Sequence, residues 1–166
     1  LITEAIGDGW ITDLTQLERL APLAEDAPFR ARFLEAKRQA KLRLVDWLAA
    51  TRGIKLDPET LIDCQIKRIY EYKRQLLAAI GIVATYDRLR SDPQLEIPPQ
   101  TYLFAGKAAP AYHLAKVIIR LITAIGRVVN RDPLIRGRLR VEFLPDYSVT
   151  LAERMIPAAD VSEQIS

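Results

Sequence analysis

The stretch LIDCQIKRIYEYKR, residues 61–74, decides the fold. Its first half, Leu61 to Ile66, is a short and mainly apolar run, which is typical of a strand buried in a sheet. Its second half is rich in cations, and a helical repeat of apolar residues runs from Tyr72 to Arg90. A short buried strand followed by a long helix is the unit from which parallel α/β sheets are built.

Two further strands are predicted downstream, from Thr101 to Ala105 and from Leu139 to Leu144, with a helix over residues 111–130 between them. Strands that alternate with helices in this way predict an α/β fold, with a Rossmann-like parallel sheet flanked by helices. The apolar residues expected to face the sheet are Leu76, Ile80 and Val83 in the first helix and Leu114, Val117, Ile118, Leu121, Ile122 and Ile125 in the second.

Residues 1–58 show helical periodicity only, and we interpret them as a helical lead before the βαβαβ portion at residues 59–166. The longest helix of the lead is predicted to begin at Asp26, with Pro28 in its first turn, and to end at Gly53. Its apolar stripe consists of Phe29, Phe33, Ala36, Ala40, Leu44 and Leu48.

The composition restricts the class of protein. With 166 residues, 49% of them hydrophobic, the chain can form one core. It has neither an apolar stretch of about 20 residues nor the features of a signal peptide, so we expect no membrane association and a cytoplasmic location. Cys64 and His113 are the only cysteine and histidine, which indicates no disulfide and no metal site.

Cations gather where the first strand ends. Lys67, Arg68 and Lys73 follow the predicted strand and open the predicted helix. Open α/β sheets bind ligands at the carboxyl ends of their strands, and a helix N-terminus favours anions. The pattern therefore predicts a phosphate site, although the charge alone fits a solvated helix start slightly better.

The other two strand ends leave their alternatives open. Gly106 either lets the backbone approach a ligand or forms a tight turn, and the role of Lys107 beside it stays undecided. Tyr147, after the third strand, either presents its ring to a flat ligand or packs as a half-buried structural residue. We expect Cys64 to lie in the core and His113 to have no catalytic role.

The basic helix at residues 28–52 suggests a different class of function. Six cations lie between Arg30 and Arg43, opposed only by Glu35. Such a helix can bind nucleic acid, or the chain can be a structural or oligomerising module. No helix-turn-helix, zinc-finger or RNP pattern accompanies it, so we rank these alternatives below the phosphate site.

The residues of this stretch resemble a known family. Residues 65–76 are similar to the KRIHEYKRQ signature of the glycogen, starch and maltodextrin phosphorylases, and the resemblance continues at residues 106–110, 143–149 and 156–166. It implies part of the C-terminal domain of the two-domain GT-B glycosyltransferase architecture. It also implies an enzyme that uses pyridoxal phosphate and inorganic phosphate to release glucose 1-phosphate from α-1,4-glucans, with a homodimeric parent.

The resemblance also implies roles for individual residues. Lys67 and Arg68 would lie at the catalytic site for the substrate phosphate, Tyr72 would contact the sugar, Lys73 would bind the cofactor phosphate, and Tyr147 would lie against the cofactor. The family's Schiff-base lysine lies beyond Ser166, so we expect neither covalent cofactor attachment nor activity from residues 1–166 alone. Departures from the family pattern are Tyr70, Ala105, Ala111 and Ser148.

Overall fold

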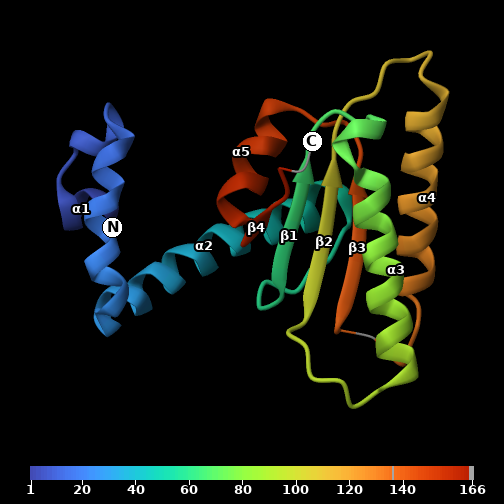
Figure 1. Cartoon of the computed structure of the whole chain (residues 1–166), viewed down its shortest axis with the longest axis horizontal. Coiled ribbons are helices and arrows are strands. Elements are labelled where there is room, and N and C mark those ends of the chain that lie inside the picture. The colour runs from blue at the N-terminus through green and yellow to red at the C-terminus, as the bar shows by residue number, and fades with distance from the viewer. Residues whose placement is uncertain (136, 165–166) are drawn as a thin grey trace.

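The protein forms an α/β fold around a parallel sheet (Figure 1). The structure, a computed structural model, describes residues 1–135 and 137–164. The strands are β1 (Leu61–Ile66), β2 (Gln100–Ala105), β3 (Leu139–Leu144) and β4 (Val161–Ser162), in the order β3-β2-β1-β4. The predicted α/β class and the three predicted strands are confirmed. The fourth strand was missed because two residues are too few to show a strand pattern.

The strand register brings three loops to one edge of the sheet. β1 pairs with β2 from Leu61–Gln100 to Ile66–Ala105, and β2 pairs with β3 up to Ala105–Leu144. The carboxyl ends of β1, β2 and β3 are therefore level with one another. β4 joins the other side of β1 through Asp63–Val161 and Cys64–Ser162.

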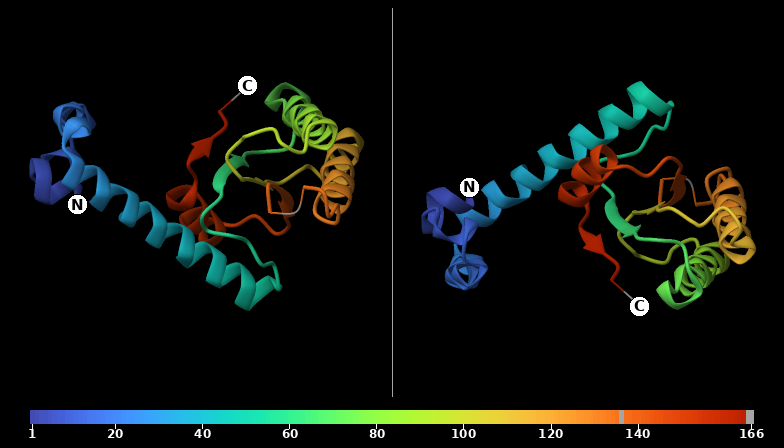
Figure 2. Two further views of the ribbon diagram at one scale, coloured as in Figure 1. Left: turned by 90° about the horizontal axis from the view of Figure 1, so that it is seen from below. Right: turned by 90° about the horizontal axis from the view of Figure 1, so that it is seen from above.

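Helices cover both faces of the sheet (Figure 2). Helices α3 (Gln75–Ser91) and α4 (His113–Val129) cover one face, and α2 (Ala27–Arg52) and α5 (Val149–Ala158) cover the other. The largest buried side chains on the first face are Ile69, Ile82, Leu89, Phe104, Ile122 and Ile135. On the second face they are Leu44, Leu48, Ile62, Leu103, Leu144 and Leu151. Cys64 belongs to the second core, as predicted.

The helical lead consists of α1 (Ile2–Ile6), the 3₁₀ segments η1 (Gly9–Ile11) and η2 (Leu14–Glu25), and α2. The predicted ends of α2 are confirmed. The Asp26 carboxylate accepts a hydrogen bond from the Phe29 amide, and Gly53 ends the helix in the left-handed region at φ 66°. The second half of α2 packs on the sheet and so shares a core with the βαβαβ portion. The division into a helical lead and a βαβαβ portion at residue 58 stays a prediction.

Only half of the predicted α2 stripe is buried. Ala40, Leu44 and Leu48 are buried, whereas the Phe33 residue is 48% exposed. The reason is visible in Figure 1, where the first half of α2 extends away from the sheet towards α1. Periodicity identifies the apolar side of a helix but does not show how far along the helix its partner reaches.

The predicted inner faces of the other long helices need correction. In α3, Ala79, Ile82 and Leu89 are buried, and the expected residues Leu76, Ile80 and Val83 are exposed. In α4, Ile118 and Ile122 are buried as predicted, and Leu114, Val117 and Leu121 are more than one-third exposed. Apolar residues lie on several sides of α3, which made its periodicity ambiguous, whereas in α4 the exposed apolar residues border the buried stripe.

Candidate functional site

The loops after β1 and β2 stay joined beyond the sheet. The Lys67 amide donates to the Ala105 carbonyl, and the Ile69 amide donates to the Lys107 carbonyl, each at 3.1 Å. A Cβ atom placed on Gly106 would lie 2.0 Å from the Lys67 carbonyl oxygen. Gly106 therefore serves the close approach of these two loops, which bring the chain at Lys67 and Lys107 together.

A pocket of about 260 Å³ lies where the three strands end. It is lined by Arg68 after β1, Lys107 after β2, and Tyr147, Ser148 and Val149 after β3. Helix α5 begins at this pocket, and the Ser148 hydroxyl caps it by accepting from the Leu151 amide at 3.3 Å. Two cations and a helix N-terminus beside an aromatic ring suit an anion attached to a flat ligand.

Tyr72 and Lys73 lie near this edge of the sheet but outside the pocket. Both belong to the 3₁₀ segment η3 (Glu71–Lys73), where the Lys73 ammonium lies 4.7 Å from the centroid of the Tyr72 ring. Arg74, in the left-handed region at φ 56°, separates η3 from α3. The prediction that the cations from Lys67 to Lys73 open the helix was therefore wrong, because α3 begins only at Gln75.

Lys67 directly follows β1, and its charge acts on the carboxyl of Glu163, which follows β4. Burial raises the pKa of Glu163, and the positive charge of Lys67 opposes this rise. The Glu163 amide donates to the Cys64 carbonyl at 2.9 Å, which fixes this segment beside β1. From β1 the chain runs through β2 to β3 on one side of the sheet and then crosses to β4 on the other side of β1, and such a reversal of strand order is where open α/β sheets bind ligands.

The carboxyl of Asp63 lies on the same side of the sheet. Burial, and then the charge of Glu163, raise the pKa of Asp63 to about 6. Two half-buried carboxyls that raise one another's proton affinity lie here, so one of them is the group that most readily holds a proton.

Three tyrosines form an aromatic cluster beside the loop. The rings of Tyr70 and Tyr112 stack, with centroids 4.8 Å apart and planes at 25°, and Tyr70 also meets Tyr72 at 4.8 Å in a tilted arrangement. Burial, and then the nearby Glu71 carboxylate, raise the pKa of Tyr112 to about 12. Tyr70, where the family signature has histidine, is thus held by stacking.

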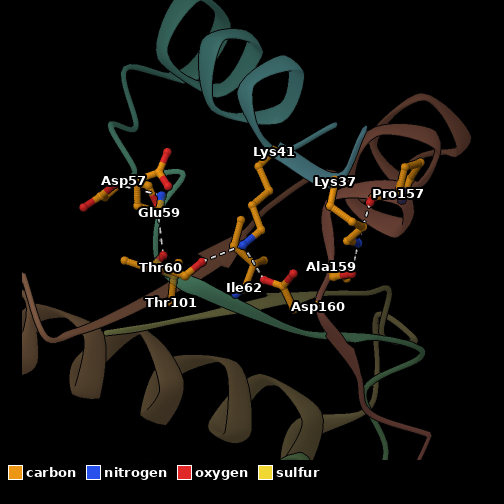
Figure 3. Close-up of polar contacts among 10 residues, drawn as sticks. All are labelled: Lys37, Lys41, Asp57, Glu59, Thr60, Ile62, Thr101, Pro157, Ala159 and Asp160. Atoms are coloured by element: carbon orange, nitrogen blue, oxygen red, sulfur yellow. Dashed lines mark hydrogen bonds and ion pairs between the residues drawn. The ribbon is translucent and has the colours of Figure 1, made fainter. Parts of the chain in front are cut away.

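The cations of the basic helix bind the chain itself. Lys41 makes an ion pair of 2.5 Å with Asp160 and donates to the Thr60 carbonyl at 2.9 Å, and Asp160 also accepts from the Ile62 amide at 2.9 Å (Figure 3). This contact attaches α2 to the start of β1 and to the residue that precedes β4.

Three other cations of the basic helix have similar partners. Lys37 donates to the carbonyls of Pro157 and Ala159 at the end of α5 (Figure 3). Arg32 pairs with Glu4 at 3.4 Å and Arg38 with Glu59 at 3.0 Å. Internal contacts thus explain most of the charge that suggested a nucleic-acid-binding helix.

Neither a metal site nor a membrane span is found within residues 1–135 and 137–164. No three His, Cys, Asp or Glu side chains of this part come together around a possible ion. None of its helices combines the length and the apolar character needed to cross a bilayer. His113 is exposed at the start of α4.

Comparison with known proteins supports the resemblance seen in the signature. A model of the carbohydrate phosphorylases matches residues 1–166. The chain belongs to this family. It is 46% identical over 165 residues to the brain form of glycogen phosphorylase of Bos taurus. It is 47% and 48% identical over 166 residues to the muscle forms of Oryctolagus cuniculus and Ovis aries.

The chain spans about 20% of the length of these curated phosphorylases, while the alignments cover 99–100% of the chain. The candidate site of this carbohydrate phosphorylase chain lies entirely within the matched region. Lys107 was the residue whose role sequence reasoning left undecided. The signal that selected Lys67 was a cation at the end of a predicted strand; Lys107, two residues after the next strand, has a similar position.

Proposed function

We propose that this chain is part of the cofactor-binding C-terminal domain of an α-1,4-glucan phosphorylase with GT-B architecture. The sheet order β3-β2-β1-β4, all parallel, supports the finer part of this proposal. It is the order of the first four strands in doubly wound dinucleotide-binding sheets. The whole enzyme would use inorganic phosphate to release glucose 1-phosphate from glycogen, starch or maltodextrin.

The observation that carries the proposal is the pocket at the three strand ends. Phosphorolysis with pyridoxal phosphate brings two phosphate groups into one site, and their mutual repulsion has to be offset by fixed cations. Arg68 offers a planar fork for two parallel hydrogen bonds, and Lys107 adds a point charge from the neighbouring strand. The N-terminus of α5 adds oriented amide groups.

The residues present fit pyridoxal phosphate. Tyr147 packs against the second core with part of its ring exposed in the pocket, and can support a flat heterocycle. Lys73 would bind the cofactor phosphate, Lys67 and Arg68 the substrate phosphate, and Tyr72, 56% exposed, would contact the glucan. When bound, the cofactor supplies a phosphate group whose second pKa is about 6, which suits proton exchange near neutral pH.

The remaining features of the proposal concern the whole enzyme. We place it in the cytoplasm as a homodimer, acting on glucan and phosphate, with neither nucleic acid nor membrane as a partner. Residues 1–166 alone are expected to form no covalent bond to the cofactor and to produce no glucose 1-phosphate. Release of glucose 1-phosphate by the purified 166-residue chain would contradict the last of these statements.

Anion binding by the chain itself tests the proposal. We expect titration with inorganic phosphate to shift the backbone amide resonances of residues 66–74, 107 and 147–149 in NMR spectra. Arg68→Met and Lys107→Met should each weaken binding by about tenfold, since a hydrogen bond to a charged group contributes roughly 1.5–3 kcal/mol. Arg131→Met, which removes an exposed charge near the opposite edge of the sheet, is the matched control. Unshifted resonances in the wild-type chain would refute the anion site.

A further inference from the structure

The backbone N–H and C=O groups of the loop from Lys67 to Lys73 point to two opposite sides. Those on one side form hydrogen bonds with the loop after β2. Lys67 and Ile69 donate to the chain after β2. The Arg68 carbonyl and the Tyr70 amide point the other way, because successive peptide groups of an extended chain alternate in direction. Their partner in the structure is a single side chain, Gln75.

Gln75 is the first residue of α3 and is fully buried, at 0% exposure. Its Nε2 group donates to the Arg68 carbonyl at 3.0 Å, and its Oε1 atom accepts from the Tyr70 amide at 3.4 Å. The carboxamide thus forms the hydrogen bonds that a neighbouring strand would otherwise form with these two backbone groups. Only a side chain that has a donor and an acceptor at its tip can do this without a charge.

Gln65 holds the other end of the loop. It lies on β1 with 2% exposure, and its Nε2 group donates to the Lys73 carbonyl at 3.0 Å. Between the two glutamines, Ile69 anchors the loop in the first core with 1% exposure. The Gln65 Oε1 atom has no hydrogen-bond partner in the part of the chain that the structure describes, and the three hydrogen bonds made by the two glutamines favour one loop conformation.

We propose that Gln75, together with Gln65, is a positioning residue for the anion site. Gln75 fixes the backbone of Arg68 and Tyr70, and Gln65 fixes that of Lys73, so that the cations are held in place before an anion arrives. Preorganisation of this kind increases affinity by reducing the ordering cost of binding. We call the hydrogen bonds from Gln75 and Gln65 to the loop the glutamine clamp. The identity of the anion rests on the proposed function, whereas the clamp rests on these hydrogen bonds alone.

Two substitutions separate the hydrogen bonds from the packing. Gln75→Met keeps the length of the side chain and removes its strong donor and acceptor, and it should weaken sulfate binding by about tenfold, the equivalent of one or two hydrogen bonds. Gln75→Glu keeps the acceptor and loses the donor when it is ionised. Burial raises the pKa of a carboxyl, so at low pH the protonated Glu side chain regains a donor for the Arg68 carbonyl. Its affinity should approach the wild-type value at pH 5 and fall at pH 8.

Sulfate is the probe because its charge is constant between pH 5 and pH 8. Gln39→Met and Gln39→Glu are the controls, since Gln39 is an exposed residue of α2 whose amide donates to Glu35. Neither control should change affinity or its pH dependence. Hydrogen exchange at two amides gives a second readout. Exchange at Tyr70 should accelerate in Gln75→Met, while exchange at Ile69, which donates to Lys107, should stay slow.

The outcomes are distinct. The clamp would be refuted if Gln75→Met kept the wild-type sulfate affinity and the slow hydrogen exchange at the Tyr70 amide. It would also be refuted if the ratio of Gln75→Glu to wild-type sulfate affinity were the same at pH 5 and pH 8. If the wild-type chain binds no sulfate, the proposed anion site fails, and Tyr70 exchange still decides the clamp. If Gln75→Met does not fold, Gln65→Met replaces it. Unchanged sulfate binding in a folded Gln65→Met chain would then refute the role of Gln65.

Discussion

Gly106→Ala tests the close backbone contact between the loops after β1 and β2, which contribute to the candidate site. The added Cβ atom would lie 2.0 Å from the Lys67 carbonyl oxygen, 3.0 Å from the Lys67 carbonyl carbon and 3.1 Å from Ile69 Cδ1. Two of these neighbours are backbone atoms, so rotation of a side chain cannot relieve the clash. The loops must separate by about 1 Å, and forced overpacking of this kind typically costs about 1–3 kcal/mol. The separation also stretches the hydrogen bond from the Ile69 amide to the Lys107 carbonyl.

Urea unfolding followed by circular dichroism measures this cost. Gly81→Ala is the matched control, because Gly81 lies within α3 and an added Cβ there meets no atom within 4 Å. That control should raise the free energy of unfolding by about 1 kcal/mol, the difference in helix propensity between glycine and alanine. Gly106→Ala should lower the free energy of unfolding and also weaken sulfate binding. A Gly106→Ala chain as stable as the wild type would refute the argument that Gly106 is required for the close approach of the loops.

Three further predictions concern other parts of the molecule. Lys41→Met should lower the free energy of unfolding by about 1.5–3 kcal/mol in urea titrations, because it leaves the half-buried Asp160 carboxylate without its cation. The pKa of Asp63 is raised to about 6, so the folded state binds more protons than the unfolded state between about pH 4 and pH 6, and stability falls as pH rises through this range. Asp63→Asn should flatten that dependence and raise stability at pH 7; an unchanged slope in urea titrations would contradict the assignment. Cys64 is fully buried and burial raises its pKa to about 12, so a thiol reagent should label it only in denaturant.

The sequence predicted most of the sheet because its strands are short apolar runs between clear breaks. β1 and β3 have the predicted bounds, and β2 begins one residue earlier than predicted. The start of α3 could not be predicted in the same way. It depends on Arg74 in the left-handed region, which is uncommon for a residue other than glycine, asparagine or aspartate. At an arginine, that conformation leaves no local signal in the sequence.

The candidate site was predicted in part for a similar reason. The rule that ligands bind at strand ends, with the family signature, selected Arg68 and Tyr147, and the structure brings them into one pocket. Neither Gln75 nor Tyr112 could be selected, because a glutamine or a tyrosine is common at helix starts and on surfaces. Their roles follow from burial and from contacts across the fold, which no spacing in the sequence reveals.

The geometry of α2 has a mechanical consequence. Lys37 binds the end of α5 and Arg38 pairs with Glu59, so the ten residues from Ala27 to Ala36 extend from this attachment as a lever arm about 15 Å long. A tilt of only about 5° at the anchored end would displace the other end by about 1 Å. Small rearrangements under α2, on the face of the sheet that includes Leu44 and Leu48, would therefore be amplified at residues 1–25.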